Sequence, residues 1–309
     1  MILSPSQQHA LDKLLPVARI ATDGSRVGLP LNPRTHSLIV GPSGCGKSFL
    51  ARRIAQELNL PCMVVNVSSW MIQGARGNNW TFNQIVEWLG TLKAGGVLVL
   101  DEIDKAGGGV GGGGVESEWR QHIRLELHDV LDSVIPPCVS LPSQNEAAMS
   151  ATALWEDTIE YLKVLPGDER QCLCDQLCHR VFVVGCGAWQ GAWKSNTRSL
   201  GFSTTAAAFP EPPSRQQILG SIDAELRLRF RDEIAVLPPM IPEDYAAVAR
   251  KLVTKIPLHA RPHWDKLIGQ AIREAAAGCL GMRMFEELVL KAMVLAQAKE
   301  VIGQSYSNE

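Results

Sequence analysis

Short apolar runs alternate with longer amphipathic stretches through the first 240 residues. The apolar runs are continuous rather than alternating, and they cover residues 36–40, 62–67, 96–101, 180–185 and 233–237. Continuous apolar strands separated by helices are typical of a parallel sheet that helices cover on both faces. The pattern therefore predicts an α/β fold with a five-stranded parallel sheet.

The pattern changes after Pro238 and Pro239, where apolar positions recur only at helical spacing. It predicts three helices, at about 242–255, 262–277 and 282–302. We therefore expect an α/β domain over residues 1–240 and a small all-helical domain over residues 241–309.

Other stretches of the α/β part have a different character. Ser and Pro start signals predict a helix from Ser4 to about Ile20, which Pro16 should bend or break. Three insertions are expected, at 106–114, 136–178 and 194–215. The first holds seven glycines in nine positions, the second includes a further helix, and the third is loop-like with three prolines.

Residues 41–48 form a complete GxxxxGK[ST] pattern between an apolar strand and a predicted helix. Its members are Gly41, Pro42, Ser43, Gly44, Cys45, Gly46, Lys47 and Ser48. Glycines let backbone N–H groups close around phosphates, and the helix N-terminus adds its positive end. We expect Lys47 to reach the β- and γ-phosphates of ATP and the Ser48 hydroxyl to ligate Mg²⁺. The alternative is a chance glycine turn before a helix.

Two carboxylates follow the apolar run that ends at residue 100. Asp101 should emerge at the carboxyl edge of the sheet, where ligands of open α/β folds bind, and we expect it to hold Mg²⁺ through water. Glu102 is expected to polarise the attacking water as a general base. Asp104 and Lys105 are read as structural or surface residues. The alternative for the acidic pair is a solvated strand end.

These motifs resemble those of the AAA+ ATPases, and within that superfamily they are most similar to the ClpX-type unfoldases. The resemblance extends over about residues 5–302, without the N-terminal zinc domain of ClpX. Residues 179–190 (HRVFVVGCGAWQ) are similar to that family's fourth strand. The resemblance implies an AAA+ P-loop NTPase core with a C-terminal helical lid, ATP and Mg²⁺ as cofactors, and ATP hydrolysis.

The resemblance also implies two arginine roles. Residues 224–245 are similar to the family segment that reaches a neighbouring subunit, which makes Arg229 the arginine finger, with Arg227 and Arg231 as competitors. Residues 277–288 are similar to the helical domain's G-x-x-G-[LM]-R pattern, which makes Arg283 the sensor-2 arginine. The alternatives are an ordinary ion pair for Arg229 and a surface position for Arg283.

The sequence departs from this family where a pore loop of the form Gly-Tyr-Val-Gly would grip a substrate. Residues 74–77 read Gly-Ala-Arg-Gly, so Ala75 and Arg76 are the pore-loop candidates and the tyrosine is missing. Trp70 or Trp80 could replace it, although a large aromatic side chain is more often core. The glycine-rich 106–114 could form a second pore loop or a spacer. Residues 200–202 (Leu-Gly-Phe) are similar to a peptidase-docking tripeptide.

Composition narrows the class of protein further. The 309 residues are 46% apolar and 20% charged, as in an ordinary globular protein, and a formal charge of −2 gives no strong overall pull toward nucleic acid or membranes. No apolar run could span a bilayer and no signal peptide is evident, so we expect a cytoplasmic protein without membrane contact. The eight cysteines are expected to be free thiols, with the cluster Cys172, Cys174, Cys178 and His179 as small buried side chains rather than a zinc site.

Three functions compete on this evidence. The first is a homo-oligomeric ring, a hexamer by resemblance, that couples ATP hydrolysis to remodelling or unfolding of a protein partner. The second is an AAA+ motor or loader that acts on nucleic acid, which Arg76 and the missing aromatic residue favour. The third, a P-loop kinase, fits poorly with the acidic pair and the trailing helices.

Overall fold

The computed structural model describes residues 3–74, 80–106, 118–136, 165–189, 192, 213–222, 224–278 and 281–305. The pore-loop candidates Ala75 and Arg76 lie outside these residues, as do the side chain of Trp80, the tripeptide 200–202 and most of the three insertions. Expectations about them stay predictions.

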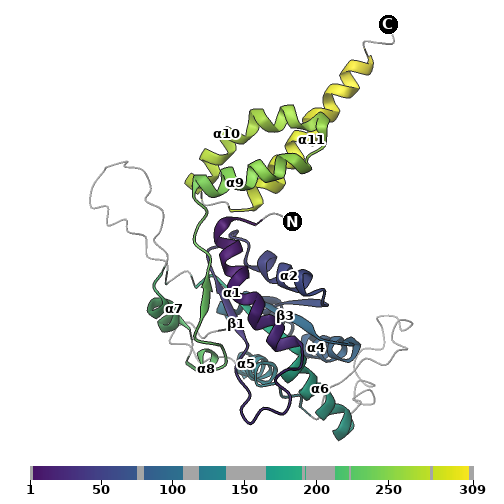
Figure 1. Ribbon diagram of the computed structural model, residues 1–309, viewed down its shortest axis with the longest axis vertical. Helices are drawn as coiled ribbons and strands as arrows, with labels where there is room; N and C mark the ends of the chain where they lie inside the picture. The colour runs from purple at the N-terminus through teal and green to yellow at the C-terminus, as the bar shows by residue number, and fades with distance from the viewer. Residues whose placement is uncertain are drawn as a thin grey trace.

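The centre of the fold is a sheet of five parallel strands (Figure 1). The strands are β1 (Ser37–Val40), β2 (Cys62–Asn66), β3 (Gly96–Asp101), β4 (Val181–Gly187) and β5 (Ile234–Val236), in the order β2-β3-β4-β1-β5. The predicted α/β class and five-stranded parallel sheet are confirmed.

Helices cover both faces of this sheet because the strands are apolar on both sides. Leu38 and Val40 pack toward one core and Ile39 toward the other. The second core is closed by α1 (Pro5–Thr22) and α2 (Lys47–Leu58). The first is closed by α3 (Val67–Gly74), α4 (Trp80–Thr91), α5 (Glu118–Leu131), α6 (Gly167–Arg180), α7 (Arg215–Ser221) and α8 (Ala224–Arg227).

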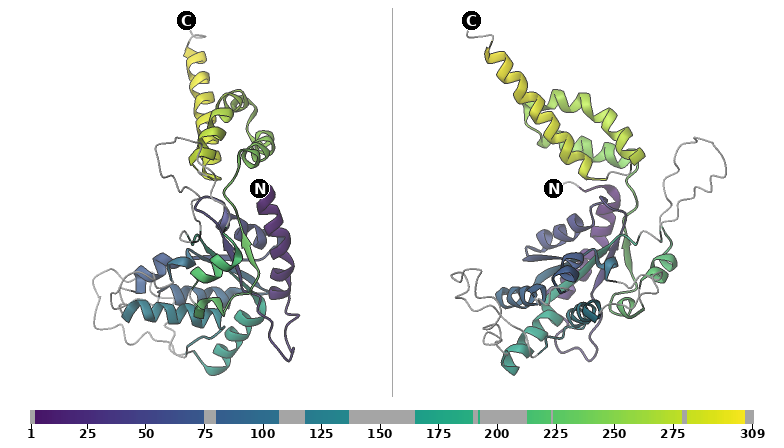
Figure 2. Two further views of the ribbon diagram at one scale, coloured as in Figure 1. Left: turned by 90° about the vertical axis from the view of Figure 1, so that its left-hand side faces the viewer. Right: turned by 180° about the vertical axis from the view of Figure 1, so that it is seen from behind.

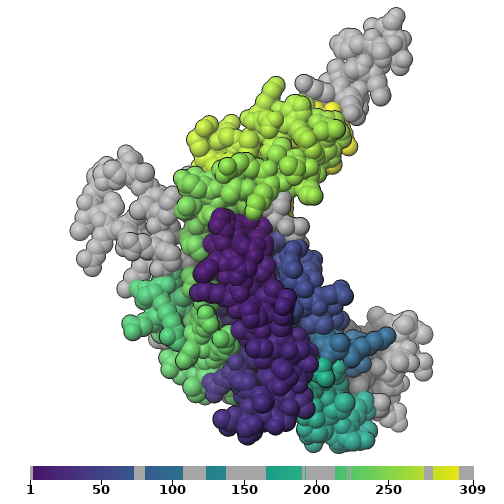
Figure 3. Space-filling view, in the orientation of Figure 1, coloured from purple at the N-terminus to yellow at the C-terminus, as the bar shows by residue number. Residues whose placement is uncertain are grey.

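Helix α1 is not broken at Pro16, because it continues through that residue for 18 residues in all. A proline in a helix leaves the carbonyl four residues earlier without its donor. Here both Pro16 and Asp12 are exposed, so water can reach that carbonyl, while Leu11, Leu14 and Ala18 hold the opposite side of the helix in the core. Figure 3 shows α1, in purple, along the surface of the molecule.

Cysteine burial also differs from expectation. Cys172 on α6 is exposed, and Cys174 and Cys178 are only partly buried. All three are free thiols, and the described residues contain no group of three or more His, Cys, Asp or Glu side chains placed to hold a metal ion.

Beyond residue 241, the described residues form helices and the turns that connect them. Helices α9 (Pro242–Leu252), α10 (Arg261–Gly278) and α11 (Arg283–Ser305) lie together at one end of the molecule, joined by 3-10 turns at Val253–Lys255 and Leu258–Ala260 (Figures 1 and 2). Their own core is built around Tyr245, Trp264 and Phe285. None of the described helices is both long and apolar enough to cross a membrane.

Candidate nucleotide site

The carboxyl ends of three adjacent strands bring the predicted site residues together. Val40, the last residue of β1, pairs with Gly187 of β4, and Asp101, the last residue of β3, pairs with Cys186 of β4. The loop 41–46 follows β1 directly and leads into α2. The phosphate-loop residues and Asp101 therefore share one edge of the sheet.

The loop ends at Gly46, whose backbone has a positive φ of 88° and caps the N-terminus of α2. Glycine adopts this left-handed conformation without steric cost, whereas other residues are strained there. Lys47 is the first residue of α2, so the loop and the positive end of the helix dipole face the same space. An anion would be stabilised at this position.

Lys47 is half-buried, and its ammonium group lies within the loop. Its Nζ donates to the carbonyl oxygens of Gly41, at 2.8 Å, and Pro42, at 3.0 Å. These neutral acceptors leave the positive charge without a carboxylate partner among the described residues. A phosphate oxygen would be a stronger, charged acceptor for the same group.

Ser48 and Asp101 meet directly. The Ser48 hydroxyl donates to Oδ2 of Asp101 at 2.6 Å, although 53 residues separate them in the sequence. Hydroxyl, carboxylate and phosphate oxygens are the ligands that Mg²⁺ prefers. The pair therefore fits a magnesium ion held between the loop and the end of β3.

Glu102 stands next to Asp101 in an unusual conformation. Its φ is +59°, a left-handed value that is uncommon for a residue other than glycine. Its exposed carboxylate accepts a hydrogen bond of 2.6 Å from the hydroxyl of Ser68, on α3. The sequence does not predict Ser68 as a site residue. Its position just after β2 is the only feature of the sequence that points to such a role.

A cavity of about 1000 Å³ lies between this edge of the sheet and the C-terminal helices. Its polar side holds Lys47, Ser48, Asp101 and Glu102. Apolar side chains from the helices line the other side, and they are Val248, Leu252, Phe285 and Val289. The volume is at the upper end for a ligand pocket, and the division into polar and apolar parts suits a nucleotide.

Arg283 is exposed and also lines this cavity as the first residue of α11. The turn before it is attached to the phosphate loop, because the backbone N–H of Met282 donates to the carbonyl of Gly44 at 2.9 Å. The N–H of Gly281 donates to the hydroxyl of the buried Tyr245 at 2.8 Å. The C-terminal helices thus contact the loop itself.

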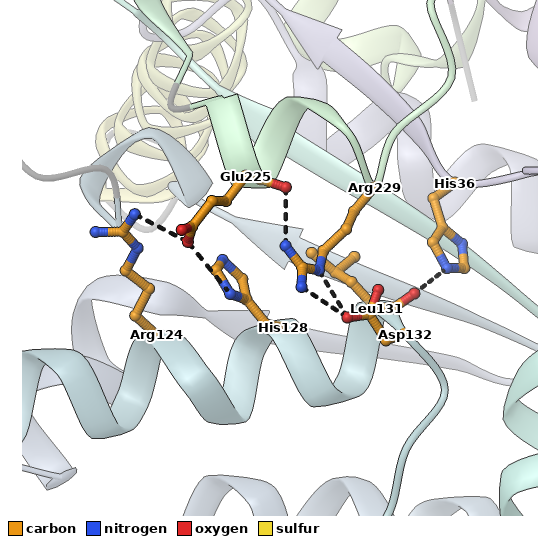
Figure 4. Close-up of polar contacts among 7 residues, drawn as sticks. All are labelled: His36, Arg124, His128, Leu131, Asp132, Glu225 and Arg229. Carbon is orange, nitrogen blue, oxygen red and sulfur yellow. Dashed lines mark hydrogen bonds and ion pairs between the residues drawn. The ribbon is translucent and has the colours of Figure 1, made fainter.

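Arg229 does not extend freely from the surface (Figure 4). Its guanidinium donates to Oδ2 of Asp132, through Nε at 2.9 Å and Nη2 at 2.7 Å, and to the carbonyl of Glu225 at 2.9 Å. Arg231 pairs with Glu233 at 3.3 Å. The side chain of Arg227 is exposed and makes no ion pair or hydrogen bond with the described residues. In this chain alone, Arg229 takes part in an ordinary ion pair.

Two thiols lie close to the site, and neither is suited to nucleophilic chemistry. Burial raises the pKa of Cys45, within the phosphate loop, and it raises the pKa of Cys186, at the end of β4, well above its ordinary value. Both cysteines are therefore neutral thiols at physiological pH and act as packing groups.

The remaining expectations near the site have mixed outcomes. Trp70 is 1% exposed in the core, and its indole N–H donates to Glu126 at 2.9 Å, so it cannot replace a pore-loop aromatic residue. Asp104 has a structural contact, since its carboxylate accepts the N–H of Trp189 at 3.3 Å. The described residues 185–189 at the end of β4 carry no amide, hydroxyl or charged side chain that could sense a phosphate.

Two comparisons with known proteins give matches to AAA ATPases. Residues 37–149 match the family model for the AAA ATPases, the ATPase family associated with various cellular activities. A solved structure of the FIGL-1 AAA domain in complex with ADP aligns with 89% of this chain and 70% of that chain, at 18% sequence identity and a TM-score of 0.44. The assignment rests on the family match and on the residues of the site. Residues 37–149 thus match an AAA-family ATPase domain, and the chain is an ATP hydrolase.

Proposed function

We propose that this chain forms a ring and couples Mg·ATP hydrolysis to the remodelling or unfolding of a protein partner. The observation that carries the ATPase part is the contact between the Ser48 hydroxyl and Asp101, beside Lys47 and Glu102, at the mouth of a cavity of nucleotide size. Few other chemistries need a hydroxyl, a lysine and two carboxylates around a glycine-rich helix N-terminus.

Different residues of the chain would bind the phosphates, hold the metal ion and accept the proton. The backbone N–H groups of the loop and the ammonium of Lys47 bind the phosphates, and Lys47 would exchange its two carbonyl acceptors for phosphate oxygens. Ser48 and Asp101 would hold Mg²⁺, which neutralises charge that develops on the phosphate oxygens. Glu102 accepts the proton of the attacking water once its carboxylate leaves Ser68.

Two arginines complete the proposed site. Arg283, at the cavity wall, would add positive charge near the γ-phosphate from the helical lid, which we place at 241–309 after a nucleotide-binding domain at 1–240. An arginine from a neighbouring subunit would act as the finger, with Arg229 as the first choice and Arg227 and Arg231 as alternatives. A finger supplied by a neighbour requires assembly into an oligomer, for which we propose a closed ring of six subunits.

The near-neutral charge of the chain favours a protein partner over nucleic acid. Nucleic acid is the second candidate, because Ala75 replaces the expected substrate-gripping aromatic residue and Arg76 beside it adds a positive charge. Titration of single- and double-stranded DNA and RNA at two salt concentrations decides between them. Tight, salt-sensitive binding that depends on Arg76 and accelerates hydrolysis would replace the protein-remodelling proposal.

The ATPase part is tested by Lys47→Ala, with Lys105→Ala as the matched control at the rim of the same cavity. Removal of the Lys47 ammonium should weaken Mg·ATP binding at least tenfold in a calorimetric titration, whereas the control should bind nearly as the wild type does. Equal affinity in the wild type and Lys47→Ala would contradict the assignment of the phosphate loop.

A further inference from the structure

We infer that Gln7, on the N-terminal helix, is a positioning residue for nucleotide binding that sets the orientation of the phosphate loop from outside. This inference rests on the proposed binding of ATP at residues 41–48. Gln7 is 38 residues away from Cys45 in sequence, and its side chain reaches the loop because α1 packs beside α2.

The amide of Gln7 is fully buried and makes two different hydrogen bonds. Its Oε1 accepts the backbone N–H of Ser4 at 3.0 Å, and the hydroxyl of Ser4 in turn accepts the N–H of Gln7 at 3.3 Å. This reciprocal capping box fixes the start of α1. The remaining end, Nε2, donates to the carbonyl of Cys45 at 2.9 Å. The capping box therefore fixes the orientation of the Gln7 amide, so that its Nε2 donor faces the loop.

The bond to Cys45 determines the direction of a peptide that should bind phosphate. A peptide bond is planar and trans, so its C=O and N–H point in opposite directions. Because Gln7 holds the Cys45 carbonyl on the outer side of the loop, the N–H of Gly46 is turned to the other side. Inward N–H groups in this part of the loop are the donors that cradle phosphates.

The neighbouring peptide is held in the same manner from a second direction. The N–H of Met282, before α11, donates to the carbonyl of Gly44, which turns the N–H of Cys45 the opposite way. At Cys45 that N–H now makes a long contact of 3.4 Å with the carbonyl of Pro42, inside the loop. Two consecutive peptides are thus oriented by segments outside the loop, and Gln7 is the only side chain among the described residues that does so.

Contact between Gln7 and the loop is also tight. A Cβ atom built on Gly46 would lie 2.3 Å from Nε2 of Gln7. The absence of a side chain at Gly46 therefore lets the amide of Gln7 approach the loop backbone. Loss of the amide would leave the Cys45 carbonyl without its donor, and the loop would then sample orientations in which its N–H groups do not converge.

Two substitutions separate the loop contact from the helix cap. Gln7→Glu preserves the capping box, since glutamate serves at this position, but places an acceptor against the Cys45 carbonyl. Gln7→Met is close in size, neutral and without a donor. A second capping box of the same form, Ser214 with Gln217 on α7, has matching hydrogen bonds of 2.8 and 3.3 Å. Gln217→Glu and Gln217→Met are therefore matched controls away from the loop.

The experiment measures the Kd of Mg·ADP, the KM and kcat of ATP hydrolysis, and the melting temperature without nucleotide. We expect both Gln7 variants to raise Kd and KM about tenfold or more while kcat stays within about threefold, because the loop binds phosphates and Glu102 performs the proton transfer. The Gln217 variants should keep wild-type Kd and KM. The Gln7 variants should lose more melting temperature than the Gln217 variants, because Gln7 is buried and Gln217 is exposed, so affinities are compared at a temperature at which every variant is fully folded.

Three outcomes would overturn the inference. The first is wild-type Kd in Gln7→Met, and the second is an affinity loss confined to Gln7→Glu that disappears at high salt, which would mean charge repulsion alone. The third is a loss of kcat with unchanged KM. If Gln7→Met does not fold, the salt dependence of Gln7→Glu decides. Failure of the proposed function is distinct, because the wild type itself would then bind no Mg·ADP.

Discussion

At the scale of single residues, the hydrogen bond between Ser68 and Glu102 has the most direct consequence for catalysis. A hydroxyl that donates to a carboxylate at 2.6 Å holds the carboxylate away from other partners. Ser68→Ala should therefore leave Mg·ADP affinity unchanged and raise the basal rate of ATP hydrolysis roughly two- to tenfold. Steady-state phosphate release measures the effect.

Ser69→Ala is the matched control for this prediction, because the Ser69 hydroxyl makes no hydrogen bond with the described residues. Its rate should equal that of the wild type. A Ser68→Ala rate at or below the wild-type rate would mean that Ser68 positions Glu102 for catalysis instead of restraining it.

His36, directly before β1, makes stability depend on pH. Its Nε2 contacts the carbonyl of Leu131 at 2.8 Å (Figure 4), and burial lowers the pKa of His36 from 6.5 to about 4. Below pH 6.5 the unfolded chain binds a proton that the folded chain excludes, so stability falls as the pH drops from about 6.5 to about 4. The loss from this residue is at most about 3 kcal/mol.

Urea unfolding at pH 7 and pH 4.5 checks this prediction. The decrease in unfolding free energy between the two pH values should be smaller in His36→Gln than in the wild type, whatever the absolute stability of the variant. His9→Gln, an exposed position on α1, serves as the control. Identical decreases in the wild type and His36→Gln would exclude His36 as the source.

The sequence could predict those site residues whose roles follow from their position along the chain, close to the end of an apolar strand. Asp101 ends one apolar strand, and Lys47 and Ser48 follow another after the glycine-rich loop 41–46, so their place at the sheet edge could be inferred before the strand order was known. Ser68 and Gln7 act through partners 34 and 38 residues away. The Ser4-x-x-Gln7 pattern does indicate a capping box, but nothing local to it indicates the phosphate loop.

At the scale of elements, the attachment of α11 to the phosphate loop depends on Gly281. Its φ is +63°, and a Cβ atom there would lie 2.1 Å from the carbonyl oxygen of Gly44. Gly281→Ala should therefore push the start of α11 away from the loop and break the bond from Met282. We expect Mg·ADP affinity to fall roughly tenfold, equivalent to about 1.4 kcal/mol.

Gly269→Ala is the control, because that glycine lies inside α10 with open space around it. Alanine is the better helix former there, so stability should rise slightly and affinity should not change. If Gly281→Ala binds Mg·ADP as tightly as Gly269→Ala does, the α11 attachment is not part of the nucleotide site.

Elements were predictable wherever the apolar pattern alone determines them. The five strands and three C-terminal helices differ from the predicted ranges by a few residues at most. The exception is α1, where the rule that proline breaks helices failed because Pro16 and Asp12 both face water. That orientation depends on which side of α1 packs on the sheet, so a local rule could not foresee it.

At the scale of the whole molecule, the pair of Arg229 and Asp132 bears on assembly. Arg229 cannot reach a neighbouring nucleotide while Asp132 and the Glu225 carbonyl hold its guanidinium. If Arg229 is the finger, ring formation must exchange these partners, and Asp132→Asn should make that exchange easier. We expect Asp132→Asn to raise hydrolysis at low protein concentration, where few rings form.

Mixed rings identify the finger. Glu102→Gln subunits lack the base and Arg229→Ala subunits lack the proposed finger, so a mixture should regain part of the activity at interfaces that combine an intact copy of each. If Arg227 and Arg231 are not fingers, Arg227→Ala and Arg231→Ala should be active alone. Mixing either of them with Glu102→Gln should then give no more activity than the active subunits have by themselves. A mixture that co-assembles and stays inactive would exclude Arg229 as a finger supplied by a neighbour.

The central claim is that the two carboxylates at the end of β3 have different roles, with Asp101 as a magnesium ligand and Glu102 as the base, at a site that binds ATP. Its most direct test is the nucleotide recovered from purified protein after incubation with Mg·ATP and a chemical quench, in the wild type, Glu102→Gln and the control Asp104→Asn. We predict ADP in the wild type and the control, and intact ATP in Glu102→Gln, with a rate loss on the order of 10²-fold or more. ADP in all three proteins at similar rates would contradict the account.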